Sequence, residues 1–148
     1  MTGKDHNKLL GVFHLVQGGL QAFGGIVVGL VYGILGVLFS ANAHRPEEQF
    51  MGTLLIVLAF VVAPLVLIFA GINITAGYKM LKEKPGARTW AIVASIVCLP
   101  GFPLGTALGV YGLWFTFGDE GKQYYLNGGQ EERQPRLDYS PPPPNHWQ

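Results

Sequence analysis

Residues 9–39 read LLGVFHLVQGGLQAFGGIVVGLVYGILGVLF, and this stretch decides the fold. No Asp, Glu, Lys or Arg occurs between Lys8 and Arg45. Charge-free stretches of similar length follow twice, between Glu48 and Lys79 and between Arg88 and Asp119. About 20 consecutive apolar residues are enough for a helix to cross the hydrocarbon core of a bilayer. The pattern therefore predicts an integral membrane protein built from α-helices.

The overall composition agrees with this prediction and excludes several classes of function. Charged residues make up 13% of the chain, whereas about 25% is typical of soluble domains. Cys98 is the single cysteine, which excludes an intrachain disulfide and a multi-cysteine metal site. The net charge of +1 leaves no basic surface for nucleic acid.

The charge-free stretches predict the helices. Residues 9–40 and 50–80 are expected to form two long helices, and Pro64 is expected to bend the second. The turn signature PGFP at residues 100–103 divides the third stretch into short spans over about 87–99 and 104–117. The expected fold is an all-α bundle of four transmembrane helices, and an alternative with three spans and a kinked last helix stays open.

Basic residues predict the topology, because Lys and Arg collect in cytoplasmic loops. They cluster before the first helix and after the second, at Lys4, Lys8, Lys79, Lys82, Lys84 and Arg88. Four spans place these residues and both termini in the cytoplasm, with Arg45 on the outside. The last two spans are shorter than an ideal crossing, so they thin the bilayer, use flanking residues, or sit within protein as a re-entrant pair.

The first helix carries the main candidate site. At 100° per residue, one face collects His14, Gln17, Gly18, Gln21, Gly25 and Gly29, and Gly25, Gly29 and Gly33 repeat at every fourth position. Small residues let helices approach closely and polar side chains hydrogen-bond between them, so this face is expected to pack inside the bundle. The alternative is a site in which His14, Gln17 and Gln21 line a solute or proton path. A pigment or haem contact through His14 lacks a second strong ligand, and no cofactor is predicted.

The later helices offer packing residues only. Asn73 is expected to hydrogen-bond across helices, and Gly101, Gly105 and Gly109 repeat the four-residue spacing. No catalytic triad, metal-ligand spacing or phosphate-binding loop occurs in the sequence. We therefore expect a protein that is not an enzyme.

The C-terminal residues differ in character from the rest. Residues 1–120 are expected to form the transmembrane domain, and residues 121–148 a polar tail unable to bury a core. Its end favours polyproline II, a conformation that binds aromatic-lined grooves. The residues expected to dock the tail on a protein partner are Arg133, Arg136, Leu137, Tyr139, Pro141, Pro142, Pro143, Pro144 and Trp147.

Three segments carry a resemblance to a known group of proteins: AGI at 70–72, LKEKPGAR at 81–88 and FPLGTALGVYGLW at 102–114. With its Gly-rich first helix, the chain resembles a family of small, uncharacterised bacterial four-helix membrane proteins that share an FP-x-GTALG-x-Y segment. The resemblance implies a tetraspan bundle in the bacterial inner membrane and no particular activity. Gly86 and the proline tail depart from the shared pattern.

These features lead to two hypotheses of different classes. The first is a non-enzymatic accessory or scaffold subunit of a larger membrane complex, docked through the Gly-rich faces and the tail. The alternative is a small oligomeric channel or transporter lined by His14, Gln17 and Gln21. The expected partners are membrane lipids and other membrane subunits, and a homo-oligomer is compatible with both hypotheses.

Overall fold

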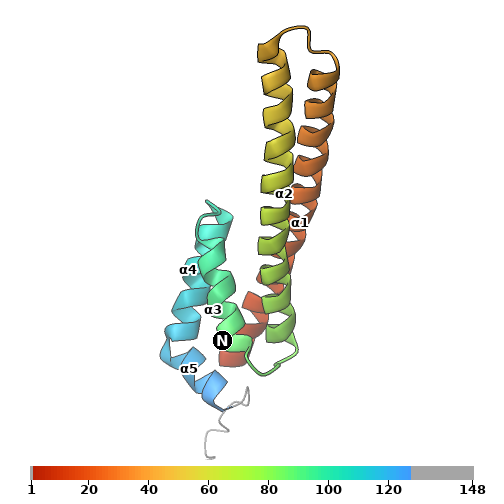
Figure 1. Cartoon of the computed structure of the whole chain (residues 1–148). Helices are drawn as coiled ribbons and strands as arrows, with labels where there is room; N and C mark the ends of the chain where they lie inside the picture. The colour runs from red at the N-terminus through yellow and green to blue at the C-terminus, as the bar shows by residue number, and fades with distance from the viewer. Residues whose placement is uncertain (1, 128–148) are drawn as a thin grey trace, which may run out of the picture.

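The computed structural model describes residues 2–127, which form five helices and no strand. The helices are α1 (Gly3–Ala41), α2 (Pro46–Leu81), α3 (Ala87–Cys98), α4 (Leu104–Phe117) and α5 (Asp119–Leu126). Figure 1 shows a long antiparallel hairpin of α1 and α2 beside a much shorter hairpin of α3 and α4. The expected all-α class is confirmed.

The long hairpin has well-marked ends. The side chain of Thr2 accepts a hydrogen bond from the backbone of Asp5, and the Asp5 carboxylate accepts one from the backbone of Thr2, which forms a capping box that starts α1. α1 therefore begins well before the apolar run that predicted it. Pro46 occupies the first turn of α2, where its missing N–H costs nothing. At 1.5 Å per residue the two helices are about 58 and 54 Å long.

The short hairpin covers only the basal part of the long one. α3 and α4 are about 18 and 21 Å long, and Figure 1 shows their turn ending roughly halfway along α1 and α2. Gly86, at the N-cap of α3, has φ of 79°, a left-handed conformation that favours glycine. The ends of α3 and α4 agree closely with the short spans predicted from the sequence.

α5 corrects the expected boundary of the polar tail. Residues 121–126, expected in the tail, continue from Asp119 and Glu120 as one helix that packs on the bundle. The side chain of Tyr124 is only 5% exposed, and Gly121 is buried. Asp119 and Glu120 lie in the first turn, where acidic residues favour the helix dipole. Tyr124 in the core and Tyr125 packed against it connect this otherwise polar helix to the rest of the bundle.

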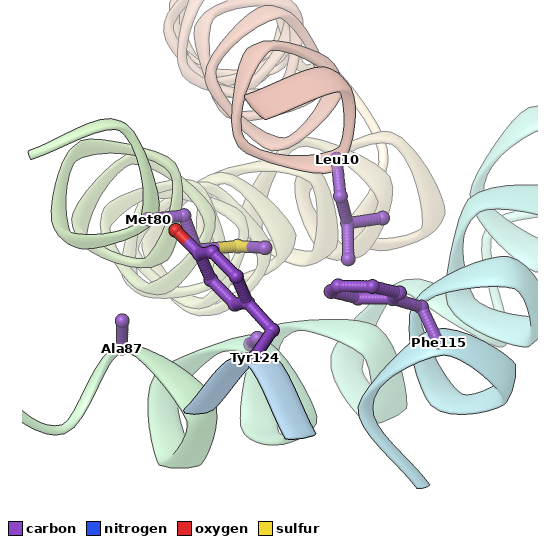
Figure 2. Close-up of a cluster of buried hydrophobic side chains, with 6 residues drawn as sticks. Leu10, Met80, Ala87, Phe115 and Tyr124 are labelled. Carbon is purple, nitrogen blue, oxygen red and sulfur yellow. The ribbon is translucent and has the colours of Figure 1, made fainter. Parts of the chain in front are cut away.

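The hydrophobic core lies at the base, where all five helices meet. Figure 2 shows Leu10 of α1, Met80 of α2 and Ala87 of α3 gathered around Phe115 and Tyr124. Leu10, Met80 and Phe115 are at most 1% exposed. This core joins the two hairpins and α5 into one unit.

Beyond the core, the outward faces of the long hairpin are apolar. Only 11% and 17% of the most apolar windows of α1 and α2 are buried, unlike the core helices of soluble proteins. Phe23 and Phe60 are 69% and 79% exposed. Among the described residues, α1 and α2 are the helices long and apolar enough to cross a membrane. These properties indicate membrane association, while crossing by α3 and α4 stays a prediction.

Candidate functional site

A polar cluster is buried between α1, α2 and the end of α3. His14 and Asn73 are fully buried, and His14 Nδ1 lies 2.9 Å from Asn73 Oδ1. Asn73 Nδ2 donates to Gln21 Oε1 at 2.9 Å and to the Phe69 carbonyl at 3.1 Å. The thiol of Cys98 lies 3.1 Å from the same Asn73 Oδ1. Asn73 thus connects three helices through its one amide group.

These bonds also determine the tautomer of His14. Because Asn73 Nδ2 donates to two oxygens, Oδ1 is the acceptor, and His14 Nδ1 must carry the proton. The other ring nitrogen, Nε2, is then a bare acceptor, buried without a hydrogen-bond partner among the described residues. That atom is enclosed by protein, so the ring offers no accessible face for a pigment or haem. Within residues 2–127 no group of three or more His, Cys, Asp or Glu side chains is placed to hold a metal ion.

Close contact between α1 and α2 makes the cluster possible. A Cβ added at Gly18 would lie 2.7 Å from a side-chain carbon of Ile74 and 2.9 Å from its backbone nitrogen. At Gly77 it would lie 2.6 Å from the carbonyl oxygen of Gly11. These glycines flank His14 and Asn73 and keep the two backbones near enough for one amide to reach across.

The contact continues along the whole hairpin as an interhelical seam. On α1 the seam consists of Gly11, Gly18, Gly25, Gly29 and Gly36, and on α2 of Gly52, Ala59, Ala63, Val66, Ala70 and Gly77. The α1 positions follow a spacing of mainly seven residues. A step of seven turns a helical position by only about 20°, so a seven-residue repeat stays on one contact line.

Gly33 lies off this seam, which corrects the four-residue stripe expected from the sequence. A Cβ at Gly33 would meet nothing within 4 Å. Two four-residue steps from Gly25 rotate the position by about 80° at 100° per residue, which carries Gly33 away from α2. Gly25 and Gly29 remain in contact, with added Cβ atoms 3.1 Å from Val66 and 2.9 Å from Ala63. The seam glycines that were not predicted from the sequence are Gly11, Gly36, Gly52 and Gly77, and none of the alanine and valine positions of the seam was predicted.

The short hairpin has its own glycine contacts. A Cβ at Gly105 would lie 2.6 Å from the Cys98 carbonyl oxygen, and one at Gly109 would lie 2.5 Å from that of Ser95. Gly101 is different, because it lies exposed in the turn after α3. Gly112, which the four-residue spacing does not include, also contacts Ser95.

Gln17 is separate from the polar cluster. It is half-buried and makes no side-chain hydrogen bond with the described residues. His14 and Gln21 are brought together through Asn73, and Gln17 is not. The polar groups of the cluster point at one another, an arrangement typical of helix packing rather than of a lined path.

A second polar group ties both ends of the described chain together at the base. Asn7 Nδ2 donates to the Met80 carbonyl at 2.8 Å and to the Tyr124 hydroxyl at 3.3 Å, and the Tyr125 hydroxyl donates to Asn7 Oδ1 at 2.7 Å. Burial raises the pKa of Tyr125, so its phenol stays protonated and keeps this donor role. This group was not predicted from the sequence, although Asn7 lies about one turn before Leu10 on the same helix.

The residues expected to dock the tail lie outside the described part of the chain. This applies to Arg133, Arg136, Leu137, Tyr139, Pro141, Pro142, Pro143, Pro144 and Trp147. No family model, curated protein or solved structure matches this chain significantly. The resemblance to small bacterial tetraspan proteins therefore stays a prediction from the sequence.

Proposed function

We propose that the protein is a non-enzymatic accessory or scaffold subunit of a larger membrane complex. Its polar interior supports this role, because His14, Gln21 and Cys98 are all engaged by Asn73 and hold helices together. A structural role needs such mutual bonds, whereas a carrier needs polar groups turned toward a solute.

The main support for a partner subunit is the length of the long hairpin. The apolar run over residues 9–39 extends about 46 Å along α1 at 1.5 Å per residue, against a hydrocarbon core of about 30 Å. Even a tilt of 40°, the upper end of the usual range, leaves about 35 Å along the membrane normal. Covering the remaining excess of about 5 Å with lipid alone requires the bilayer to thicken locally, which costs free energy. A neighbouring membrane subunit on the distal half of the hairpin, residues 29–58, covers it without exposing apolar side chains to water.

We place α1 and α2 across the bacterial inner membrane, with the α2–α3 loop and both termini in the cytoplasm. The loop carries Lys82 and Lys84, in keeping with the cytoplasmic preference of basic residues. α3 and α4 are only about 18 and 21 Å long, so we place them as a re-entrant pair in preference to two full crossings. The C-terminal segment beyond residue 127 is proposed as a second docking element on sequence grounds.

Cysteine labelling in intact cells tests this topology, in a Cys98→Ala background. Cysteines at Asn42 and Gly86, both exposed, are expected to react from opposite sides of the membrane. Phe102 is 87% exposed at the tip of the short hairpin. Labelling of a cysteine at Phe102 from the Asn42 side would establish four crossings and overturn the re-entrant pair.

Photo-crosslinking tests the accessory role. A photoreactive residue at Ile34, on the distal half and 58% exposed, is expected to give a protein adduct of fixed mass in native membranes. The matched control is Ile96, which is 53% exposed on the short hairpin and is expected to react mainly with lipid. Lipid adducts alone at Ile34 would contradict the proposal. An adduct containing only a second copy of this chain would replace it with a homo-oligomer.

A further inference from the structure

A cavity of about 380 Å³ lies at the base of the molecule, apart from the polar cluster. It is formed where the α2–α3 loop, the beginning of α3 and the end of α5 meet, and it is lined in part by Lys84, Arg88, Tyr124 and Tyr125. Tyr124, whose hydroxyl is turned toward Met80 in Figure 2, belongs both to the hydrophobic core and to the lining of the cavity. The cavity volume is within the range of small-ligand sites.

The charge around this cavity is positive. Lys84 and Arg88 are its basic residues, and Glu83 is the acidic residue among the described groups that line it. The Glu83 carboxylate already pairs with Lys4 at 3.4 Å. Because burial raises the pKa of Tyr125, that phenol is uncharged and does not neutralise Arg88.

One buried donor at this place lacks an acceptor among the described residues. Arg88 Nε is buried and has no hydrogen-bond partner among the described residues. α3 has no side-chain cap at Gly86, and the positive end of its helix dipole lies in the same region. The first N–H of the helix, that of Ala87, already donates to the Lys84 carbonyl at 3.1 Å. A buried donor on a charged group is costly without an acceptor. An anion rich in oxygen complements the Arg88 guanidinium that lines the cavity and the positive end of the helix dipole, and the guanidinium fork matches phosphate best.

The surroundings put the cavity at the depth of lipid headgroups. Lys79 lies over the Trp90 ring at 5.0 Å, and Lys84 over the Tyr78 ring at 4.7 Å. Aromatic rings combined with lysines are typical of the interface between hydrocarbon and water. Basic pockets between helices on the cytoplasmic side are a recurrent form of anionic lipid site.

We propose that the basal cavity binds the phosphate headgroup of an anionic phospholipid through Arg88, Lys84 and the beginning of α3. The site requires the membrane placement of α1 and α2 but no partner subunit. An experiment that disproves the accessory role would therefore not disprove the lipid site.

Lipid binding by the full-length protein in neutral detergent tests the proposal, with native mass spectrometry counting bound molecules. Phosphatidylglycerol is expected to bind one copy more tightly than phosphatidylcholine. Arg88→Gln and Lys84→Gln should each lower the affinity for this one phosphatidylglycerol molecule roughly fivefold, which is the effect of removing one basic residue near an anionic headgroup. Arg45→Gln, which removes the same charge at the far end of the long hairpin, is the matched control and should leave binding unchanged.

Three results would overturn the site. Equal losses in the Arg88 and Arg45 variants would mean diffuse attraction to the whole surface. Equal binding of phosphatidylcholine would remove the role of headgroup charge. Displacement of phosphatidylglycerol by millimolar inorganic phosphate would assign the cavity to a soluble anion. Lys84 is exposed, so the Lys84→Gln variant still tests the site if Arg88→Gln fails to fold.

Discussion

Adding one methyl group at Gly18 should separate the two long helices. The new Cβ would lie 2.9 Å from the backbone nitrogen of Ile74 and 3.0 Å from the carbonyl oxygen of Ala70, where ordinary contact begins at 3.4 Å. Neither atom belongs to a flexible side chain, so α1 has to move away by about 0.5 Å. Overpacking of this kind costs about 1–3 kcal/mol.

The neighbouring Gly19 provides the control, because a Cβ there meets nothing within 4 Å. Both substitutions to alanine gain the same helix propensity, about 1 kcal/mol. Their difference in unfolding free energy therefore isolates the packing cost. We expect Gly18→Ala to be less stable than Gly19→Ala by about 1–3 kcal/mol.

The measurement is unfolding by sodium dodecyl sulfate in mixed micelles, followed by far-ultraviolet circular dichroism. The shift of α1 should also lengthen the bond between His14 and Asn73, which lies close to the substituted position. Equal stabilities of the two variants would refute the reasoning, because the distance between α1 and α2 would then not depend on the seam.

Three further predictions concern the other polar contacts. Asn73→Leu should lower the unfolding free energy by about 1–2 kcal/mol, because interhelical hydrogen bonds are lost. Gln17→Leu should change it by less than about 0.5 kcal/mol. Similar losses in both variants would show that the hydrogen bonds of the polar cluster do not stabilise the fold. Hydrogen bonds from Thr2 lower the pKa of Asp5, so the capping box stabilises α1 at pH values above the unfolded pKa of about 4, and this stabilisation is lost as pH falls through the lower folded pKa. The protection factors of first-turn amides, corrected for the intrinsic exchange rate at each pH, should fall over that range, and Asp5→Asn should abolish this pH dependence. Tyr125→Phe should cost about 1–2 kcal/mol by stranding the buried acceptor of Asn7; an unchanged thermal midpoint would show that water replaces the hydroxyl.

Helix ends were predictable from the sequence where proline or charge marks them. The PGFP turn separates α3 from α4 where predicted, because proline cannot donate a backbone hydrogen bond, whereas α2 begins at Pro46, four residues before the predicted start at residue 50. The start of α1 was placed too late, because the apolar run begins at Leu9 while the capping box lies at Thr2 and Asp5. Hydropathy marks where a helix enters lipid, and capping marks where it begins.

The candidate site was predictable in its residue types but not in its connections. His14, Gln21 and Asn73 stand out as polar residues in apolar helices, yet Cys98 reads as a small apolar filler. Its bond to Asn73 depends on the register of α3 against α2. The sequence predicts which face of a helix is buried but not the axial register of one helix against another. The burial of Tyr124 was missed for the same reason.

The short connection between α1 and α2 bears on how the chain is synthesised. The two long helices and their entire seam lie before residue 82, so this pair is complete before α3 leaves the ribosome. A helical hairpin can insert as a unit and acquire further helices later, as in the two-stage view of membrane protein folding. At that time Asn73 has His14 and Gln21 as partners but not yet Cys98. The Asn73 amide oxygen would then be the point at which the end of α3 joins a hairpin that has already formed.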